Sequence, residues 1–366
     1  MRAERPPTIL HVVGTRPNFM KAAPVMKALD EMPRLKQTLA HTGQHYDERM
    51  SQVFFDQLHL PRPDVNLGVG SGSHAEQTAG ALAGVEADLR RHSADLALVA
   101  GDVNSTMAAA LAATKLNVAV GHVESGLRSG DWSMPEEVNR VVTDRVSDLL
   151  LCTSEDAVEN LAREGIASGV ELVGNTMIDS LFRILDGTDR EAALAAQGVE
   201  RRDYVLVTLH RPALVDDPAK LGEVIEVLGE LSATEPVLFP AHPRTVARLE
   251  QAGIGMPDRL RVAEPMQYAE FIALEAEARL VITDSGGVQE ETSALGVPCL
   301  TYRTSTERPV TVEFGTNTLV GVDPDALRSA ATEALAAEPP ERPPHIPHWD
   351  GEAGPRAAEA IAAFFA

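Results

Sequence analysis

Two acidic side chains follow short apolar runs that are typical of β-strands. Asp102 comes just after the run that ends at Ala100, and Glu124 stands in the segment His122-Val-Glu124-Ser-Gly. For Asp102 an ordinary helix N-cap is an alternative interpretation, whereas packing at a strand end gives no reason for the charge of Glu124. Because ligands of parallel sheets bind at the carboxyl ends of the strands, we expect both carboxylates to face the binding cleft.

A third acidic group opens the predicted helix Pro135–Arg145. Glu136, Asn139 and Arg140 are three and four positions apart, so the spacing predicts that they share one face of this helix. One of the two adjacent glutamates, Glu136 and Glu137, could instead serve only to complement the helix dipole.

Basic residues gather in predicted loops although the chain as a whole is acidic, with 32 Lys and Arg against 54 Asp and Glu. The turn at Gly14 brings Arg16 and Lys21 to the opening of a helix, where fixed cations suit an anion. A turn with two solvated cations is the alternative interpretation.

Histidines continue this pattern in the second half of the chain. His210 and Arg211 follow a predicted strand, and His242 follows the next one. We favour phosphate contact or proton transfer for His210 over a structural role, because a cationic neighbour and a strand end accompany it.

The segment Ser285-Gly286-Gly287 separates a predicted strand from a predicted helix. Its backbone amides and the positive end of the helix dipole would favour a phosphate, and Glu290 or Glu291 one turn later could accept ribose hydroxyls. A tight turn explains the glycines but not the paired glutamates. The turn at Gly14 is not the dinucleotide fingerprint Gly-x-Gly-x-x-Gly, and the similar text at Gly68–His74 does not open a helix straight after a strand, so no nicotinamide cofactor is expected.

Strands and helices must position these residues. The alternation of strand and helix patterns along the chain predicts parallel sheets covered by helices. The expected strands are Ile9–Val13, Thr38–His41, Leu96–Ala100, Val118–His122, Asp148–Cys152 and Val170–Val173, then Tyr204–Thr208, Val237–Pro240, Arg259–Val262, Arg279–Thr283 and Pro298–Tyr302. We therefore expect an α/β protein with Rossmann-like domains at 1–185 and 186–350 and a last helix within 351–366. Ligands of such sheets bind at the carboxyl ends of strands, which predicts a site in a cleft between the domains.

Composition excludes several classes of function. A formal charge of −22 repels nucleic acid and anionic lipid. Two cysteines are too few for a disulfide framework and wrongly spaced for zinc, so we expect no metal site and a reducing compartment. No apolar stretch approaches the length of a membrane span and no signal-peptide core is evident, which predicts a cytoplasmic protein without membrane partners.

Taken together, the motifs resemble those of the non-hydrolysing UDP-N-acetylglucosamine 2-epimerase family. The segments that match, in family order, are Gly14-Thr-Arg-Pro17, Thr42-Gly-Gln-His45, Gly101-Asp102, His122-Val-Glu124, Pro135-Glu-Glu-Val-Asn-Arg140, Val173-Gly-Asn-Thr176, Thr208-Leu-His-Arg211, Asp284-Ser-Gly-Gly-Val-Gln-Glu-Glu291 and Thr306-Glu-Arg-Pro309. They span nearly the full length of both predicted domains.

The resemblance implies two Rossmann-like domains that face each other across a cleft, as in the glycosyltransferase-B fold, and a final helix that returns to the first domain. It implies a homodimeric isomerase without a cofactor, which interconverts UDP-N-acetylglucosamine (UDP-GlcNAc) and UDP-N-acetylmannosamine (UDP-ManNAc). The family's proposed mechanism is anti elimination of UDP to a 2-acetamidoglucal, followed by re-addition.

The match also implies roles for individual residues. Asp102 and Glu124 would transfer the proton, Glu136 would be a third acidic group, and His210 would assist at the phosphates. The residues expected to bind substrate are Arg16, Lys21, Arg140, Arg211, His242, Ser285, Gly286, Gly287, Glu291 and Arg308. Gln44 and His45 are candidates for contact with a second, activating UDP-sugar, although the stretch 67–77 differs from that of family members with this regulation.

Other functions stay open at this point. The sugar could be a related 2-acetamido sugar, such as a 2,3-diacetamido uronic acid, because parts of the sequence are closer to that branch of the family. A hydrolysing 2-epimerase would release UDP and free N-acetylmannosamine. A glycosyltransferase of the same fold, or a nucleotide-sugar binding module without catalysis, would present similar contacts to UDP.

Overall fold

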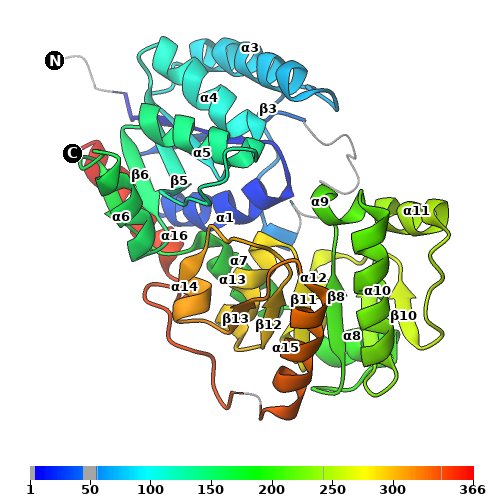
Figure 1. The fold of residues 1–366 in the computed structure, drawn as a ribbon. Coiled ribbons are helices and arrows are strands. Elements are labelled where there is room, and N and C mark those ends of the chain that lie inside the picture. Colours follow the sequence, from blue (N-terminus) through cyan, green and yellow to red (C-terminus); the bar gives the residue numbers. More distant parts are fainter. Residues whose placement is uncertain (1–4, 44–54, 56, 242, 339) are drawn as a thin grey trace. The chain divides into compact units, whose positions relative to one another are not determined.

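The computed structural model describes residues 5–43, 55, 57–241, 243–338 and 340–366, and for Arg16 it describes the backbone alone. The chain divides into two compact units (Figure 1). Unit 1 consists of Met1–Phe182 together with Pro347–Ala366, and unit 2 is Arg183–Ile346. The chain therefore leaves unit 1 once, within a helix, and returns to it near its end.

Unit 1 is built on a parallel sheet with the strand order β3-β2-β1-β4-β5-β6-β7. Its strands are β1 (Thr8–Val13), β2 (Lys36–His41), β3 (Val65–Asn66), β4 (Leu96–Ala100), β5 (Ala119–Ser125), β6 (Leu149–Cys152) and β7 (Val170–Leu172). Its helices are α1 (Arg16–Asp30), α3 (His74–His92), α4 (Asn104–Lys115), α5 (Pro135–Val146), α6 (Glu155–Arg163), α7 (Thr176–Asp186), which crosses into unit 2, and α16 (Ala353–Phe364).

Apolar residues on both faces of this sheet explain why helices cover both sides. Ile9 and its neighbours on one face pack with Leu29 of α1 and Ile361 of α16. Leu10, which points to the opposite face, packs in a separate cluster with Leu89 of α3 and the alanines of α4. Strands that are apolar on both faces are typical of parallel sheets.

The C-terminal helix α16 is anchored to the body of unit 1 at its first turn. The carboxylate of Asp179 in α7 accepts the backbone amides of Ala353 at 3.2 Å and Gly354 at 2.7 Å. A Cβ at Gly354 would lie 2.7 Å from the backbone of Pro24 in α1, so only glycine permits this approach. Burial raises the pKa of Asp179 to about 6, although both amides favour the carboxylate.

Unit 2 repeats the same design with a parallel sheet in the order β10-β9-β8-β11-β12-β13. Its strands are β8 (Val205–Thr208), β9 (Val237–Pro240), β10 (Leu260–Ala263), β11 (Leu280–Thr283), β12 (Cys299–Thr301) and β13 (Asn317–Leu319). Its helices are α8 (Arg190–Gln197), α9 (Pro212–Val215), α10 (Pro218–Ser232), α11 (Pro243–Ala252), α12 (Tyr268–Glu277), α13 (Gly286–Leu295), α14 (Pro309–Glu313) and α15 (Pro324–Ala336).

The two faces of the unit 2 sheet also carry separate apolar clusters. Val205 and Val207 of β8 pack with α10, α11 and α15, whereas Leu206 packs with α8, α12 and α13. The expected α/β class with two Rossmann-like sheets is confirmed. None of the helices in the described ranges has the length and apolar character needed to span a bilayer.

In each sheet the strand order reverses once, between β1 and β4 in unit 1 and between β8 and β11 in unit 2. Connections from neighbouring strands diverge to opposite sides at such a point and leave a crevice at the carboxyl ends, where α/β proteins bind ligands. The turn at Gly14 and Asp102 follow β1 and β4, and His210 and Ser285 follow β8 and β11. These candidate residues therefore lie at the reversal points of their own sheets.

We predict that Asp179→Ala loosens α16, because two amides of its first turn lose their acceptor. The loss of two such bonds lowers the free energy of unfolding by about 2 kcal/mol. Urea unfolding followed by tryptophan fluorescence measures it, since buried Trp349 donates to the carbonyl oxygen of Thr153 beside this helix. Asp186→Ala, an exposed position on the same helix α7, is the control. Equal losses in the two variants would contradict the anchoring role.

Candidate active site

Glu124 is a buried carboxylate at a distorted point of strand β5. The pairing of β5 with β6 shifts register between Val123 and Ser125, and Glu124 there has a φ of +69°. A non-glycine residue in this left-handed region costs on the order of 1 kcal/mol and occurs mostly where function requires it. An extra residue in a strand redirects a side chain, so this bulge sets the direction of the Glu124 carboxylate.

Lys21 of α1 neutralises this carboxylate. Its Nζ lies 2.7 Å from both carboxylate oxygens of Glu124, and the two side chains are 4% and 3% exposed. Gly101, after β4, gives the ammonium its room, because a Cβ at this residue would lie 2.7 Å from Nζ. The φ of Gly101 is +68°, which also favours glycine. The Gly101-Asp102 loop and the Lys21–Glu124 pair therefore form one packed group.

Helix α5 binds both the side chain and the backbone carbonyl of Asp102. Arg140 donates to Asp102 Oδ2 at 2.5 Å, and Asn139 donates to the backbone carbonyl of Asp102 at 2.9 Å. Helix α4 begins at Asn104 with Val103 as its N-cap residue, so the N-cap interpretation of Asp102 is wrong. Asp102 is thus a carboxylate held at the end of β4 by a buried guanidinium.

The prediction that Glu136, Asn139 and Arg140 share one face of α5 is only partly confirmed. Asn139 and Arg140 are buried, but Glu136 is exposed, and its neighbour Glu137 shares the buried face instead. Glu137 pairs with Arg140 and accepts the amides of Ser129 at 3.0 Å and Gly130 at 2.9 Å. Burial opposes ionisation of Glu137, yet these hydrogen bonds outweigh it and lower its pKa.

Sequence reasoning missed the role of Glu137 as the partner of Arg140. The signal was present, because residues 137 and 140 are three positions apart and match a helical turn as well as 136 and 140 do. The loop at Ser129 and Gly130 distinguishes Glu137 from Glu136, because its backbone amides donate hydrogen bonds to Glu137.

In unit 2, Asp284 connects the loop after β11 with the loop after β8, at the point where the strand order reverses. Its carboxylate accepts the backbone amides of His210 at 3.0 Å and Arg211 at 2.8 Å, and it lies 3.4 Å from His210 Nδ1. The His210 side chain is 48% exposed. Asp284 therefore fixes the loop after β8 while leaving the imidazole accessible to solvent.

The predicted phosphate loop opens helix α13. Ser285 is its N-cap residue, and Gly286 is its first residue. A Cβ at Gly286 would lie 2.7 Å from Arg308, whose guanidinium packs against this turn. Arg308 is buried, and its Nε lies 2.8 Å from Glu290 while another nitrogen pairs with Glu307. The expected cation is therefore adjacent to the glycine turn and already pairs with two carboxylates.

The two glutamates of this helix have different partners. Glu290 pairs with Arg308, whereas Glu291 accepts a hydrogen bond of 2.5 Å from the hydroxyl of Tyr268. Glu275, which is fully buried, has a pKa well above its usual value because of its burial and the negative charge of Glu291.

Four of the predicted residues cannot be placed. Gln44, His45 and His242 lie outside the described residues, and for Arg16 the side chain does. Within the described ranges, no group of three or more His, Cys, Asp or Glu side chains is arranged to hold a metal ion.

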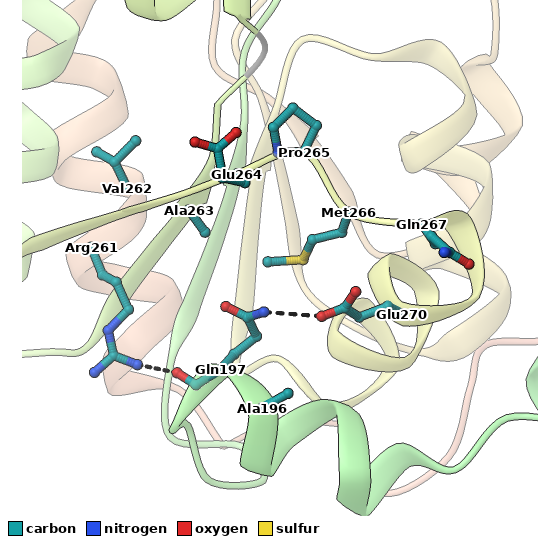
Figure 2. Close-up of a pocket in the computed structure, with 10 residues that line it drawn as sticks. All are labelled: Ala196, Gln197, Arg261, Val262, Ala263, Glu264, Pro265, Met266, Gln267 and Glu270. Carbon is teal, nitrogen blue, oxygen red and sulfur yellow. Dashed lines mark hydrogen bonds between the residues drawn. The ribbon is translucent and has the colours of Figure 1, made fainter. Parts of the chain in front are cut away.

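An open cavity of about 530 Å³ lies at the carboxyl end of β10 in unit 2 (Figure 2). Residues 263–267 line it together with Gln197 of α8 and Glu270 of α12, whose side chains are hydrogen bonded at 2.9 Å. Figure 2 also shows Arg261 bonded to the carbonyl of Gln197. None of the predicted site residues lines this cavity, so it is separate from them.

The sequence matches the model of the UDP-N-acetylglucosamine 2-epimerase family over residues 27–362. The chain belongs to this family. The UDP-N-acetylglucosamine 2-epimerase of Methanocaldococcus jannaschii is 42% identical over 329 residues, which cover 87% of this chain and 90% of that protein. The UDP-2,3-diacetamido-2,3-dideoxy-D-glucuronate 2-epimerase of Pseudomonas aeruginosa is 41% identical over 331 residues, which cover 89% and 92%.

A solved structure of the family has the same fold. The M. jannaschii UDP-GlcNAc 2-epimerase in complex with UDP-GlcNAc and UDP superimposes with a TM-score of 0.88 at 39% identity, covering 97% of this chain and 99% of that one. The family resemblance drawn from the motifs is thereby confirmed, and with it the class of a nucleotide-sugar 2-epimerase, an isomerase.

We predict that Lys21→Met destabilises this family member because it leaves the carboxylate of Glu124 buried without a cation. Breaking a buried pair on one side typically lowers the free energy of unfolding by about 3 kcal/mol or more. Chemical denaturation would measure the change. The double variant Lys21→Met/Glu124→Gln should recover part of the loss, since no buried charge is left alone.

Lys27→Met provides a matched control, because Lys27 is exposed on the same helix. It should change the free energy of unfolding by no more than about 0.5 kcal/mol. If both lysine variants unfold at the same denaturant concentration as the parent protein, the Lys21–Glu124 pair does not stabilise the fold.

Proposed function

We propose that this protein interconverts UDP-GlcNAc and UDP-ManNAc by removing and restoring the hydrogen at C2 of the sugar. Membership of the 2-epimerase family and the names of its relatives support this reaction. The observation that carries the proposal is the pair Asp102 and Glu124 at the ends of adjacent strands, each held by a buried cation. Two fixed carboxylates are what a proton transfer in both directions needs.

The chemistry of the substrate favours elimination. The C2 hydrogen of UDP-GlcNAc is not next to a carbonyl, so enolisation cannot remove it. In the proposed reaction one carboxylate takes the C2 proton while the C1–O bond to UDP breaks, which gives 2-acetamidoglucal and UDP. Re-addition of UDP to C1, with proton delivery to the opposite face of C2, gives UDP-ManNAc and restores the atom balance. Positive charge that develops at C1 is stabilised by carboxylates, as in glycosidases.

In this proposal Asp102 and Glu124 exchange the C2 proton, and Glu136 is the third acidic group. Lys21 and Arg140 orient the two carboxylates, because each lies within 2.7 Å of its partner. For epimerisation one of the two groups must start as the carboxylate that accepts the C2 proton, and the other as the carboxylic acid that delivers a proton to the opposite face.

Unit 2 would bind the nucleotide. The turn that opens α13, at Ser285, Gly286 and Gly287, suits the diphosphate because the positive end of the helix dipole lies there. Glu291, oriented by Tyr268, would accept the ribose hydroxyls, and His210, whose imidazole is exposed, would assist at the phosphates. Further phosphate contacts are proposed for Arg16, Arg211, His242 and Arg308.

The sugar could instead be a 2,3-diacetamido uronic acid carried on UDP. The similarity to the P. aeruginosa epimerase of that substrate, at 41% identity, favours it as the second candidate. The elimination would be the same, since the C2 position is unchanged. We also propose, from the family resemblance alone, that the protein is a homodimer in the cytoplasm.

Incubation with UDP-GlcNAc in deuterated water tests the reaction. We expect ¹H and ³¹P NMR to show UDP-ManNAc with deuterium at C2, because the proton removed mixes with solvent before one is returned. Free N-acetylmannosamine and UDP that accumulate from the start would indicate a hydrolysing enzyme. Intact UDP-GlcNAc without exchange, with conversion of the diacetamido substrate, would favour the second candidate, and no C2 exchange in either substrate would refute an epimerase.

We predict that Asp102→Asn lowers kcat by about 10²-fold or more, because an amide cannot take the proton. The affinity for UDP, measured by calorimetry, should stay within about threefold, as the proposed nucleotide contacts lie in other loops. Glu86→Gln, which removes one partner of an exposed ion pair on α3, is the matched control and should leave kcat unchanged. Full turnover in Asp102→Asn would exclude Asp102 from proton transfer.

A further inference from the structure

The ring of His122 lies next to the loops that carry the carboxylates of Asp102 and Glu124. His122 belongs to β5, two residues before Glu124, and is completely buried. Its Nε2 lies 2.8 Å from the carbonyl oxygen of Gly101, the residue before Asp102. Its Nδ1 lies 2.6 Å from Asp144 Oδ1. Both ring nitrogens therefore contact oxygen atoms, one in the Asp102 loop and one on helix α5.

Asp144 extends this contact to the loop after Glu124. Its second oxygen, Oδ2, accepts the backbone amide of Gly126 at 3.0 Å and a hydrogen bond of 2.6 Å from Arg128. Arg128 in turn binds Glu164 through two hydrogen bonds of 2.6 and 2.8 Å. Burial opposes ionisation of Asp144, but His122 and Arg128 outweigh it and lower its pKa.

The backbone at Glu124 needs such support. Gly101, Glu124 and Gly126 have φ values of +68°, +69° and +83°. A Cβ at Gly126 would lie 2.4 Å from the carbonyl oxygen of Ala157, so this loop is tightly packed as well. Glycine adopts such φ values at no steric cost, so the strained residue is Glu124, and a strained residue persists only where surrounding contacts over-determine its conformation.

Helix α5 supplies the opposite side of the same arrangement. Asn139 and Arg140 bind Asp102 directly, and Asp144, one turn after Arg140, binds His122 and Gly126. The amide of Gly101 also donates to the carbonyl of Val123 at 3.0 Å, which joins the two loops.

We propose that His122 and Asp144 are positioning residues that fix the Asp102 loop and the Glu124 loop relative to each other. Neither side chain would touch the substrate. His122 holds the loop of Asp102 through the Gly101 carbonyl, and Asp144 holds the loop of Glu124 through the Gly126 amide. The role in catalysis rests on the proposed epimerase function, but the linkage between the loops does not.

Kinetics of Asp144→Asn and His122→Phe test the catalytic part. Because a misplacement of about 1 Å can lower a rate by about 10²-fold, we expect kcat to fall by about that factor. KM for UDP-GlcNAc and the dissociation constant of UDP should stay within about threefold. The double variant should lose little more than either single variant, since the two residues act through one contact. Glu159→Gln, at an exposed ion pair on α6, is the control and should keep the kcat of the parent protein.

Amide hydrogen exchange tests the linkage without any substrate. In Asp144→Asn we expect faster exchange in peptides that contain Gly101 and Gly126, with unchanged exchange in the strand Leu149–Cys152. Amide exchange can be measured even if the parent protein does not convert UDP-GlcNAc. The proposed function would then fail, but the linkage between the loops would still be tested. The same measurement also applies if His122→Phe does not fold.

Two results would overturn the proposal. One is full kcat with unchanged exchange at both loops in a folded Asp144→Asn variant. The other is faster exchange throughout unit 1 together with weaker UDP binding and a lower melting temperature, because that combination describes a general loss of stability.

Discussion

The need to neutralise buried carboxylates governs the arrangement of unit 1. Removing a charge from water is unfavourable by several kcal/mol unless an opposite charge and hydrogen bonds replace the water. Buried Glu124 meets this need through Lys21, and partly exposed Asp102 pairs with buried Arg140, which belongs to a different helix. The ends of two strands and the starts of two helices must therefore assemble together, and an error in one leaves a buried ion alone.

The strand order makes this assembly feasible. In unit 1 the loops after β1, β4 and β5 are neighbours although they lie far apart in the sequence, because these strands pair in parallel in that order. Unit 2 uses the same order, and Asp284 after β11 binds the loop after β8. A strand order that reverses at the same place thus positions acidic groups in one unit and a glycine turn with histidine in the other, and the loop sequences decide which.

Much of this could be predicted from local patterns. The alternation of strands and helices predicts both sheets except for the edge strands β3 and β13, and it predicts that Asp102, Glu124 and Ser285 lie close to strand ends. Partner choice was not predictable, since Lys21 and Glu124 are separated by a whole series of elements and nothing in the periodicity links them. For Glu137 the helical spacing to Arg140 was visible, but spacing alone did not distinguish it from Glu136, and the amides of the loop at Gly130 do.

The return of the chain to unit 1 has a consequence for biosynthesis. Unit 2 is one continuous segment, whereas unit 1 lacks α16 until the last residues have been made. Domains generally fold as units while the chain emerges from the ribosome, N-terminal ones first. In this protein unit 2 is translated after most of unit 1 but can finish folding before it. The apolar side of α1 is fully covered only once α16 has been made.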